Sequence, residues 1–429
     1  MSEVAQVPQL RFPEFSGEWE EKRFDSLYPT VRNGFVGVAT PYYVEEGVPY
    51  LQGKNIKSGA INRNGLVYIN ESFHQKSKKS QLRQNDIVMV QSGHVGECAV
   101  ITEEFEDTNC HALLVSTPTH DIDSKFYINY FYSKFGRKKI YRITTGNTIK
   151  HILSSDLKIQ TVSNPSYQEQ QKIAAFLTAV DNKIEQLSKK QALFSEYKKG
   201  LMQQIFSQAI RFKADDTPGQ PLLPNGNSPS GSEFPDWEEK KLGDIGHTFN
   251  GLTGKTKDDF GRGKPYIQYM QIFESSKINI DNFGLVDVRD DENQKVAQYG
   301  DVFFTTSSET PDAVGYSSVL LDDIDKLYLN SFCFGFRPNS LDELSPNFAQ
   351  FLLRSAHFRR RVVRLAQGST RYNMSKVQLM KEVISLPCLK EQTKIANFLS
   401  SIDSKIEQVS KQLDESKQFK KALLQQMFV

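Results

Sequence analysis

The chain has 429 residues, and 53 basic against 51 acidic side chains give it a formal net charge of +2. This length predicts at least two domains, and the balanced charge neither requires nor excludes a nucleic-acid partner, because that depends on how charges cluster. No apolar run reaches the roughly 18 residues of a membrane span, and four scattered cysteines predict reduced thiols and a cytoplasmic protein without a membrane partner.

The first half of the chain predicts an α+β domain with a β-rich core. Short apolar runs at 86–90, 98–101 and 113–116 are bounded by turn residues, as is typical of strands, and 126–135 is typical of a helix. A basic run follows at 137–139. The candidates for contact with DNA in this half are Gln52, Lys54, Asn55, Lys76, Lys78, Lys79, Arg83, Thr145, Asn147, Thr148 and Lys150.

A long helix follows this domain and returns at the end of the chain. Residues 169–207 and 391–429 align without a gap at an offset of 222 and share 20 of 39 residues. Apolar residues recur at alternating steps of four and three, which predicts a coiled-coil seam, and the other copy is the obvious antiparallel partner. Ser166, three residues before Glu169, predicts a helix cap. The predicted core of the helix pair is Ile173, Leu177, Val180, Ile184, Leu187, Leu201, Ile395, Leu399, Ile402, Ile406, Val409 and Leu423, with Gln191, Lys198, Ser416 and Lys420 as polar exceptions.

The second half repeats the first before its own long helix. The only two tryptophans, Trp19 and Trp237, open matching Trp-Glu-Glu-Lys segments. The runs 301–306 and 318–321 predict strands, and 347–364 predicts a helix. The candidates for contact with DNA in this half are Gln268, Gln271, Arg359, Arg360, Arg364, Ser369, Thr370, Arg371, Tyr372 and Asn373.

These matches predict five parts. They are a first domain at 1–164, a first helix at 165–210, a flexible linker at 211–235, a second domain at 236–386 and a second helix at 387–429. The linker is rich in Pro, Gly, Ser and Asn, which favours an irregular surface segment. A connection of this length lets the second half return, which would bring the two ends of the chain near each other.

The candidate residues suit DNA chemically, although simpler roles exist for each of them. Lys and Arg on phosphates supply salt-dependent affinity, and Arg, Lys, Asn and Gln on base edges supply sequence choice. A charged run is more often a solvated face. The segments at 146–148 and 368–370 occupy equivalent places with different polar contents, as two readers of different sequences would, or they are tight turns packed on the helix.

Fragments that imitate catalytic or ligand-binding motifs are incomplete. Asn164-Pro165-Ser166-Tyr167 lacks the second proline of the methyltransferase motif that it resembles, and 251–256 has Phe249 where a phosphate loop needs its first glycine. The histidines lack metal-ligand spacing. The sequence therefore predicts a non-catalytic chain that binds no metal and no cofactor.

The double Trp-Glu-Glu-Lys segment and the two Pro-x-x-x-Glu-Gln-x-Lys-Ile-Ala-x-Phe-Leu helix starts, at Pro165 and Pro387, resemble the specificity subunit of type I restriction-modification systems. The resemblance implies two target-recognition domains, at about 30–160 and 248–381, each for one half of a split DNA site. It also implies that the paired helices form a ruler of about 58 Å and bind two methyltransferase subunits. Those partners would hold S-adenosylmethionine, and motor-nuclease subunits would hold ATP and Mg.

Two other classes of protein compete with this interpretation. The first is an enzyme, a methyltransferase or nuclease that acts without partners, and the incomplete motifs argue against it. The second is a coiled-coil assembly scaffold that binds partners without DNA specificity. Only the specificity subunit would make an assembled complex prefer one DNA sequence.

Overall fold

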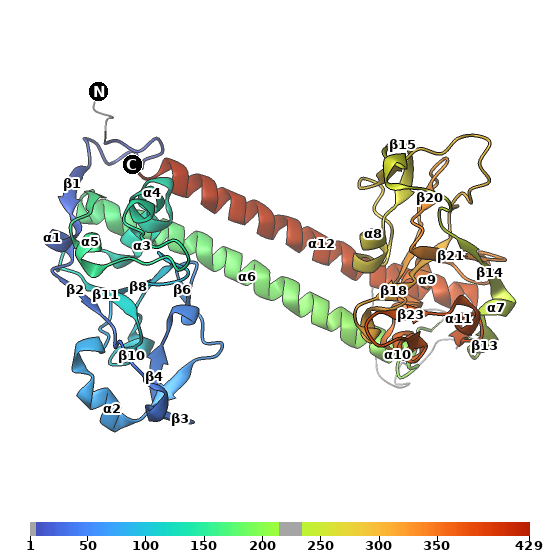
Figure 1. The fold of residues 1–429 in the computed structure, drawn as a ribbon, viewed down its shortest axis with the longest axis horizontal. Helices are drawn as coiled ribbons and strands as arrows, with labels where there is room; N and C mark the ends of the chain where they lie inside the picture. The colour runs from blue at the N-terminus through green and yellow to red at the C-terminus, as the bar shows by residue number, and fades with distance from the viewer. Residues whose placement is uncertain (1–5, 214–233) are drawn as a thin grey trace. The chain divides into compact units, whose positions relative to one another are not determined.

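The computed structural model describes residues 6–213 and 234–429, so most of the predicted linker lies outside the described residues (Figure 1). The chain divides into two compact units. Unit 1 comprises residues 1–188 and 411–429, and unit 2 comprises residues 189–410. Each unit therefore combines one α+β domain with parts of both long helices, and the predicted fold class is confirmed.

The elements of the two halves follow one another in the same general order. The first half contains β1 Glu20–Arg23, α1 Phe24–Leu27, β2 Thr30–Asn33, β3 Tyr43–Val44, β4 Val48–Leu51, β5 Ile56–Lys57, β6 Ala60–Ile61, β7 Val67–Ile69, α2 Glu71–Lys76, β8 Ile87–Val90, β9 Cys98–Val100, β10 Asn109–Cys110, β11 Leu113–Thr117, α3 Ser124–Tyr132, α4 Lys134–Arg142, α5 Ser154–Lys158, β12 Thr161–Asn164 and α6 Tyr167–Phe206. The second contains β13 Glu238–Lys241, α7 Leu242–Ile245, β14 Gly246–Asn250, β15 Phe260–Ile267, α8 Tyr269–Glu274, β16 Gly284–Val286, β17 Val302–Thr305, β18 Ser307–Ser308, β19 Ser317–Val319, β20 Tyr328–Leu329, β21 Cys333–Pro338, α9 Pro346–Leu352, α10 Ala356–Arg364, β22 Ala366–Gln367, β23 Tyr372–Met374, α11 Lys376–Leu379, β24 Val383–Leu386 and α12 Leu389–Gln426.

A four-stranded antiparallel sheet forms the centre of each domain. Its order is β2-β11-β8-β9 in unit 1 and β14-β21-β17-β19 in unit 2, so the topology is repeated. A second sheet forms a lobe beside it: lobe 1 is the sheet β10-β4-β7-β3 with α2, and lobe 2 is the sheet β16-β15-β20. The strands predicted from apolar runs are present in both central sheets, within two residues of their expected ends.

The two predicted domain helices were wrong in one respect, because each is two helices. The first becomes α3 and α4, and the second becomes α9 and α10. Serines make the breaks: the Ser133 hydroxyl accepts a hydrogen bond from the Gly136 N–H, and the Ser355 hydroxyl accepts one from the Phe358 N–H, both at 3.2 Å. A serine that caps a new helix in this way ends the preceding one.

Three aromatic rings occupy matching places in the core of each unit. In unit 1 the ring of Phe126 lies 5.7 Å from Trp19 and 5.3 Å from Phe428, between ring centroids. In unit 2 the ring of Phe348 lies 6.4 Å from Trp237 and 5.8 Å from Phe206. The third ring comes from the end of α12 in unit 1 and from the end of α6 in unit 2. Each domain is therefore completed by the end of the helix that begins in the other half of the sequence.

The two long helices contact each other within both units. In unit 1 the start of α6 and the end of α12 share one core, and Lys420 forms an ion pair with Asp181 at 2.6 Å. In unit 2 the end of α6 and the start of α12 share a second hydrophobic core, and Lys198 forms an ion pair with Asp403 at 2.5 Å. Two of the polar exceptions in the predicted seam are thus lysines that pair with an aspartate of the other helix. The predicted seam residues are all buried or half-buried.

A buried glutamate joins each domain to the start of its helix. The side chain of Glu169 is 2% exposed, and Arg11 donates to both of its oxygens at 2.8 Å. In unit 2 the side chain of Glu391 is fully buried, and Arg211 contacts its two oxygens at 3.2 and 2.8 Å. The Ser166 hydroxyl also accepts a hydrogen bond from the Glu169 N–H at 3.3 Å, which confirms the predicted cap.

The glutamine that follows each of these glutamates, Gln170 or Gln392, also connects the domain to the helix. The Gln170 side chain accepts from the Asp123 N–H and donates to the Pro165 carbonyl, both at 3.0 Å. The Gln392 side chain makes the matching contacts with Ser345 and Pro387, at 2.9 and 3.0 Å. The Glu-Gln pair therefore ties the helix start to the preceding proline turn and to the start of a domain helix.

The segments near the two ends of the described chain meet in unit 1. The Leu10 N–H donates to the Gln426 carbonyl at 2.9 Å, and the Ser163 hydroxyl donates to the Val429 carbonyl at 2.7 Å (Figure 1). In unit 2 the Ile210 N–H makes the matching bond with its own preceding helix. The ends thus lie together, as expected from a second half that returns.

We predict that Arg11→Ala destabilises unit 1 by about 3–5 kcal/mol, because it leaves the buried Glu169 carboxylate without its charged partner. Thermal and denaturant unfolding of the full chain measure this change. Arg23→Ala is the matched control, because Arg23 pairs with Asp25 at the surface and should cost less than about 1 kcal/mol. A double change, Arg11→Met with Glu169→Met, should be less destabilising than Arg11→Ala alone. Equal losses would show that the unpaired charge is not the cause.

Candidate nucleic-acid interface

A hairpin with an exposed turn follows the second domain helix in each unit. We call residues 145–151 tip hairpin 1 and residues 367–373 tip hairpin 2. Thr145 and His151 exchange two backbone hydrogen bonds of 2.9 Å, and Gln367 pairs with Asn373 in the matching position. Residues 146–149 form the turn of tip hairpin 1 and residues 368–371 that of tip hairpin 2, and all of them are exposed. The candidates at Thr145, Asn147, Thr148, Lys150, Ser369, Thr370, Arg371 and Asn373 lie exposed on these hairpins, and Tyr372 lies half-buried there.

Both turns depend on a glycine in the same place. Gly146 has a φ of +91°, and a Cβ at that position would lie 2.2 Å from the Ile149 carbonyl oxygen. Gly368 has a φ of +133°, and its Cβ would lie 2.2 Å from the Arg371 carbonyl oxygen. Only glycine tolerates this approach. The two hairpins therefore share one backbone conformation and differ in their side chains.

A loop after the central strand supports each hairpin. In unit 1 the Gly93 N–H donates to the Lys150 carbonyl at 3.1 Å, and the side chains of Gln91 and His151 are 3.2 Å apart. In unit 2 the loop forms β18, which pairs with β23, and the Arg371 Nε donates to the Ser307 hydroxyl at 3.2 Å. The hairpins are thus held from beneath while their turns stay exposed.

The basic helix before each hairpin divides its cations between the interior and the surface. Arg359 lies 4.4 Å over the Tyr316 ring and donates to three backbone carbonyls at 2.6–2.8 Å, and burial lowers its pKa. Its counterpart Arg137 lies 4.5 Å over the Tyr132 ring. Arg360 and Arg364, in contrast, are exposed. Of the three arginine candidates in α10, Arg360 and Arg364 are therefore the two available to phosphates.

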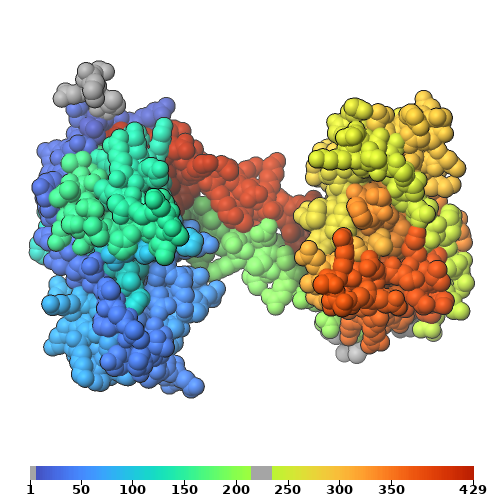
Figure 2. Space-filling model, viewed as in Figure 1, coloured from blue at the N-terminus to red at the C-terminus, as the bar shows by residue number. Residues whose placement is uncertain are grey.

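Two exposed cations of unit 1 occupy the places of Arg360 and Arg364. They are Lys138 and Arg142 of α4. Neither is among the residues predicted to contact DNA, although Lys138 lies in the basic run at 137–139 and the offset of 222 that relates the two long helices also relates these pairs. Figure 2 shows both segments on the surface of their units, green in unit 1 and orange-red in unit 2.

Lobe 1 carries a groove lined by lysines. One hollow of about 500 Å³ is lined by residues 33–35 and 75–80, and an adjoining one of about 450 Å³ is lined in part by Lys78, Lys79 and Arg83. Lys76, Lys78, Lys79 and Arg83 are exposed, and none forms an ion pair with any other residue that the structure describes. This arrangement suits an anionic ligand that is longer than one phosphate.

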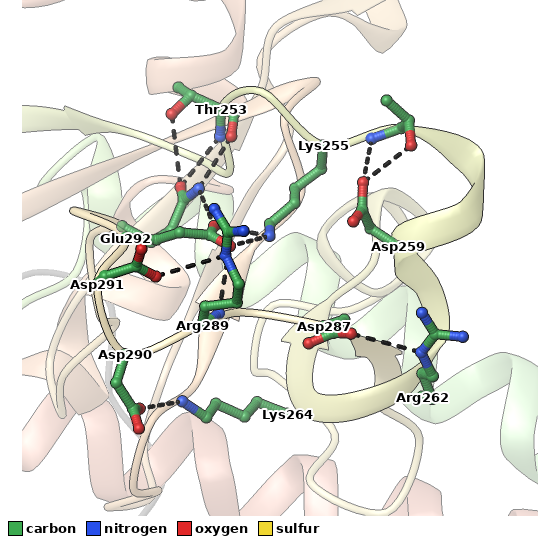
Figure 3. A network of polar contacts seen from close by, with 12 residues as sticks. Thr253, Lys255, Asp259, Arg262, Lys264, Asp287, Arg289, Asp290, Asp291 and Glu292 are labelled. Carbon is green, nitrogen blue, oxygen red and sulfur yellow. Dashed lines mark hydrogen bonds and ion pairs between the residues drawn. The ribbon is translucent and has the colours of Figure 1, made fainter.

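In lobe 2 two lysines are paired with carboxylates (Figure 3). Lys255 pairs with Glu292 at 2.6 Å, and Lys264 pairs with Asp290 at 2.9 Å. Hydrogen bonds from Lys255 and Gln294 lower the pKa of Glu292 to about 2. Lys255 lies in the fragment that imitates a phosphate loop, and its ammonium group is paired within the protein.

Two candidates hold loops together inside the protein. Asn55 is fully buried, and its amide donates to the Asn62 carbonyl at 2.9 Å. Gln271 is 6% exposed and donates to the Asn279 carbonyl at 3.2 Å. Gln52 and Gln268, by contrast, are half-buried, and Lys54 is exposed. The geometry does not favour Asn55, Gln271 or Arg359 as DNA contacts, because their polar atoms are used internally.

The described residues contain neither a cluster that could hold a metal ion nor a helix that could span a membrane. Within 6–213 and 234–429, no group of three or more His, Cys, Asp or Glu side chains is arranged to hold a metal ion. Among the same residues, no helix combines the length and the apolar character needed to span a membrane. Two α+β domains of the same topology, each with an exposed tip hairpin and each followed by a long helix, define a class of protein with a duplicated domain.

The family model for the type I restriction modification DNA specificity domain matches residues 16–193 and 235–416. The chain belongs to this family. Specificity subunits of type I systems are non-catalytic, bind DNA and assemble with the other subunits of the restriction-modification enzyme.

Known relatives match along most of their length. The type I restriction enzyme MjaVIII specificity subunit of Methanocaldococcus jannaschii is 23% identical over 97% of this chain and 92% of its own. The EcoKI specificity subunit of Escherichia coli is 20% identical over 88% of this chain and 80% of its own. The crystal structure of a type I S subunit from M. genitalium has the same fold, with a TM-score of 0.57, 18% identity and 99% of each chain covered.

We predict that Arg360→Ala and Arg364→Ala each weaken DNA binding by the assembled complex to a similar extent on all sequences, and each reduce the salt slope by about 1. Fluorescence anisotropy at several salt concentrations measures both effects. Arg359→Ala serves as the contrast: it should destabilise unit 2 by about 1–3 kcal/mol, because three backbone carbonyls lose their charged donor. An unchanged salt slope for the two exposed arginines would remove them from the interface.

Proposed function

We propose that this chain is the DNA-sequence specificity subunit of a type I restriction-modification enzyme, and that each unit recognises one half of a split, asymmetric site. One observation carries the proposal: the same hairpin backbone occurs in both units with different exposed side chains. A module built to bind the same partner twice would keep those side chains. A module built to recognise two sequences must change them while its scaffold stays.

The proposed interface separates affinity from sequence choice. Phosphates contact the exposed cations of α4 and α10 and the lysine groove of lobe 1, which gives salt-dependent affinity. Base edges contact the side chains of the two tip hairpins, which offer donors and acceptors suited to the major groove. Lys255 and Lys264 of lobe 2 contribute little to this affinity, because both are paired with carboxylates.

We further propose that α6 and α12 pair along their whole length as an antiparallel coiled coil. The ion pairs of Lys198 and Lys420 support this register, because the two lysines are 222 residues apart and so are their aspartate partners, Asp403 and Asp181. A 40-residue helix is about 60 Å long, which allows the pair to set the spacer between two half-sites.

The helix pair also offers two equivalent docks. Tyr197 is 51% exposed and Phe419 is 53% exposed, and the two residues occupy the same place in the repeat. Exposed aromatic side chains are typical anchors of protein interfaces. We propose that they contact two methyltransferase subunits, which hold S-adenosylmethionine, and that motor-nuclease subunits with ATP and Mg join the complete enzyme. A scaffold without DNA specificity explains these docks but not the different hairpins.

Exchange of residues 25–160 for the matching domain of a relative should change one half of the recognised site. The other half and the spacer should stay, because unit 2 and both helices are unaltered. Maps of methylated adenine in cells that contain the chain and its methyltransferase partner measure all three. A change in both halves would contradict the modular arrangement. The absence of any chain-dependent motif, with an active partner, would favour the scaffold.

Tyr197→Ser and Phe419→Ser should each weaken the binding of one methyltransferase subunit, and the double variant should weaken both. We expect a loss of roughly 30-fold per site, as for an aromatic anchor. Native mass spectrometry of the complex gives the subunit count. Gln186→Ser and Gln408→Ser are matched controls, because both glutamines are exposed and occupy one repeat position. Equal loss at a control and an aromatic site would place the dock elsewhere.

A further inference from the structure

The two tip hairpins differ most at one structurally matched position. Ile149 and Arg371 each lie three residues after the turn glycine, and each has its carbonyl oxygen in the same close approach to that glycine. The hairpin ladders on either side also match. The backbone therefore presents the two side chains in equivalent ways, although one is a branched hydrocarbon and the other a planar cation.

The isoleucine is the hydrocarbon side chain among the exposed residues of tip hairpin 1. Ile149 is 66% exposed, on a turn whose other side chains are polar or charged. The hairpin ladder and the turn glycine do not require a hydrocarbon there, because Arg371 occupies the same backbone position in unit 2. Because tip hairpin 1 is the surface that we propose for contact with bases, this exposed hydrocarbon is available to an apolar group in the major groove.

Arg371 is also exposed, but its guanidinium, unlike the Ile149 side chain, is held by a hydrogen bond. Its Nε donates to the Ser307 hydroxyl at 3.2 Å, and no carboxylate among the described residues pairs with its guanidinium. A guanidinium held at one nitrogen keeps its two terminal nitrogens in a fixed fork. This is the geometry that contacts two acceptors of one base side by side.

We propose that Ile149 contacts the 5-methyl group of a thymine in one half-site, and that Arg371 contacts the O6 and N7 atoms of a guanine at the equivalent step of the other half-site. The inference rests on the proposed function, and it adds the chemistry of one base in each half. Thymine is the base that places a hydrocarbon in the major groove, and guanine is the base that places two acceptors there side by side.

The first experiment exchanges the two side chains. The complex of this chain with its methyltransferase partner is studied as wild type, as Ile149→Arg and as Arg371→Ile, and methylated adenine is mapped in each case. We expect Ile149→Arg to change one position of one half-site from thymine toward guanine, and Arg371→Ile to change one position of the other half-site in the opposite sense. Ile149→Val is the control, because it keeps a branched hydrocarbon and should keep the motif.

The second experiment removes the methyl group from the DNA. Each thymine of the half-site recognised by unit 1 is replaced in turn by uracil, and binding is measured with the same complex. One replacement should weaken binding by about fourfold, which corresponds to the loss of one buried methyl-sized group. That replacement should have no effect on the Ile149→Ala complex. For Arg371→Ala, binding to the guanine site should fall by roughly 5- to 150-fold, with little change on a site that lacks this guanine.

The outcomes separate this inference from the proposed function. A wild-type complex without any chain-dependent motif would overturn both. A clear wild-type motif that persists in the Ile149→Arg and Arg371→Ile complexes would overturn the inference alone. Both variants should fold, because both residues are exposed, and thermal unfolding checks this. A uracil series without effect would also overturn it, and would leave Ile149 as a wedge between bases or as a contact with a protein subunit.

Discussion

The structure depends on a buried glutamate at the start of each long helix. A carboxylate at such a position is stable only with a charged partner, and Arg11 and Arg211 supply it for Glu169 and Glu391. The glutamine that follows each glutamate fixes the proline turn and a domain helix at the same point. Because these contacts come from four separate segments, they fix how each domain meets its helix. The repeated helix-start motif therefore has a structural function.

A scaffold that is fixed in this way leaves the surface free to differ. Two half-buried cations coincide between the two halves, because Arg137 and Arg359 occupy one repeat position and each lies over a tyrosine ring. Different side chains at one repeat position also make the same kind of hydrogen bond. The Tyr132 hydroxyl donates to the Cys98 carbonyl of β9, and the Arg354 guanidinium donates to the Ser317 carbonyl of β19. Burial lowers the pKa of Arg354 to about 10, as expected of an internal cation. Differences at exposed matched positions then point to recognition.

The net charge of the chain is near neutral, but the two lobes differ in how many of their lysines are paired with carboxylates. In lobe 1 the lysines near residue 78 are exposed and unpaired among the described residues, whereas in lobe 2 Lys255 and Lys264 are neutralised by carboxylates. The two halves of one chain thus present different local charge at their surfaces. Total charge says little about such a protein, because affinity for phosphates depends on cations that lack an acidic neighbour.

The sequence by itself determined the repeat, the two long helices, the strands of the central sheets and the family. These features depend on periodicity and on local residue patterns, which a single sequence displays directly. It also placed the two tip hairpins among the candidates, because their glycines and polar residues stand out along the chain.

Only the tertiary structure decided which polar side chains remain available. Arg359 and Arg360 are neighbours in one basic run, yet the first is bound to carbonyls more than 40 residues away and the second is exposed. Asn55 and Gln271 belong to loops that they hold together. Hydrogen-bond partners that are distant in sequence leave no local pattern, so the distinction between a structural and a recognising side chain appeared only when the chain was folded.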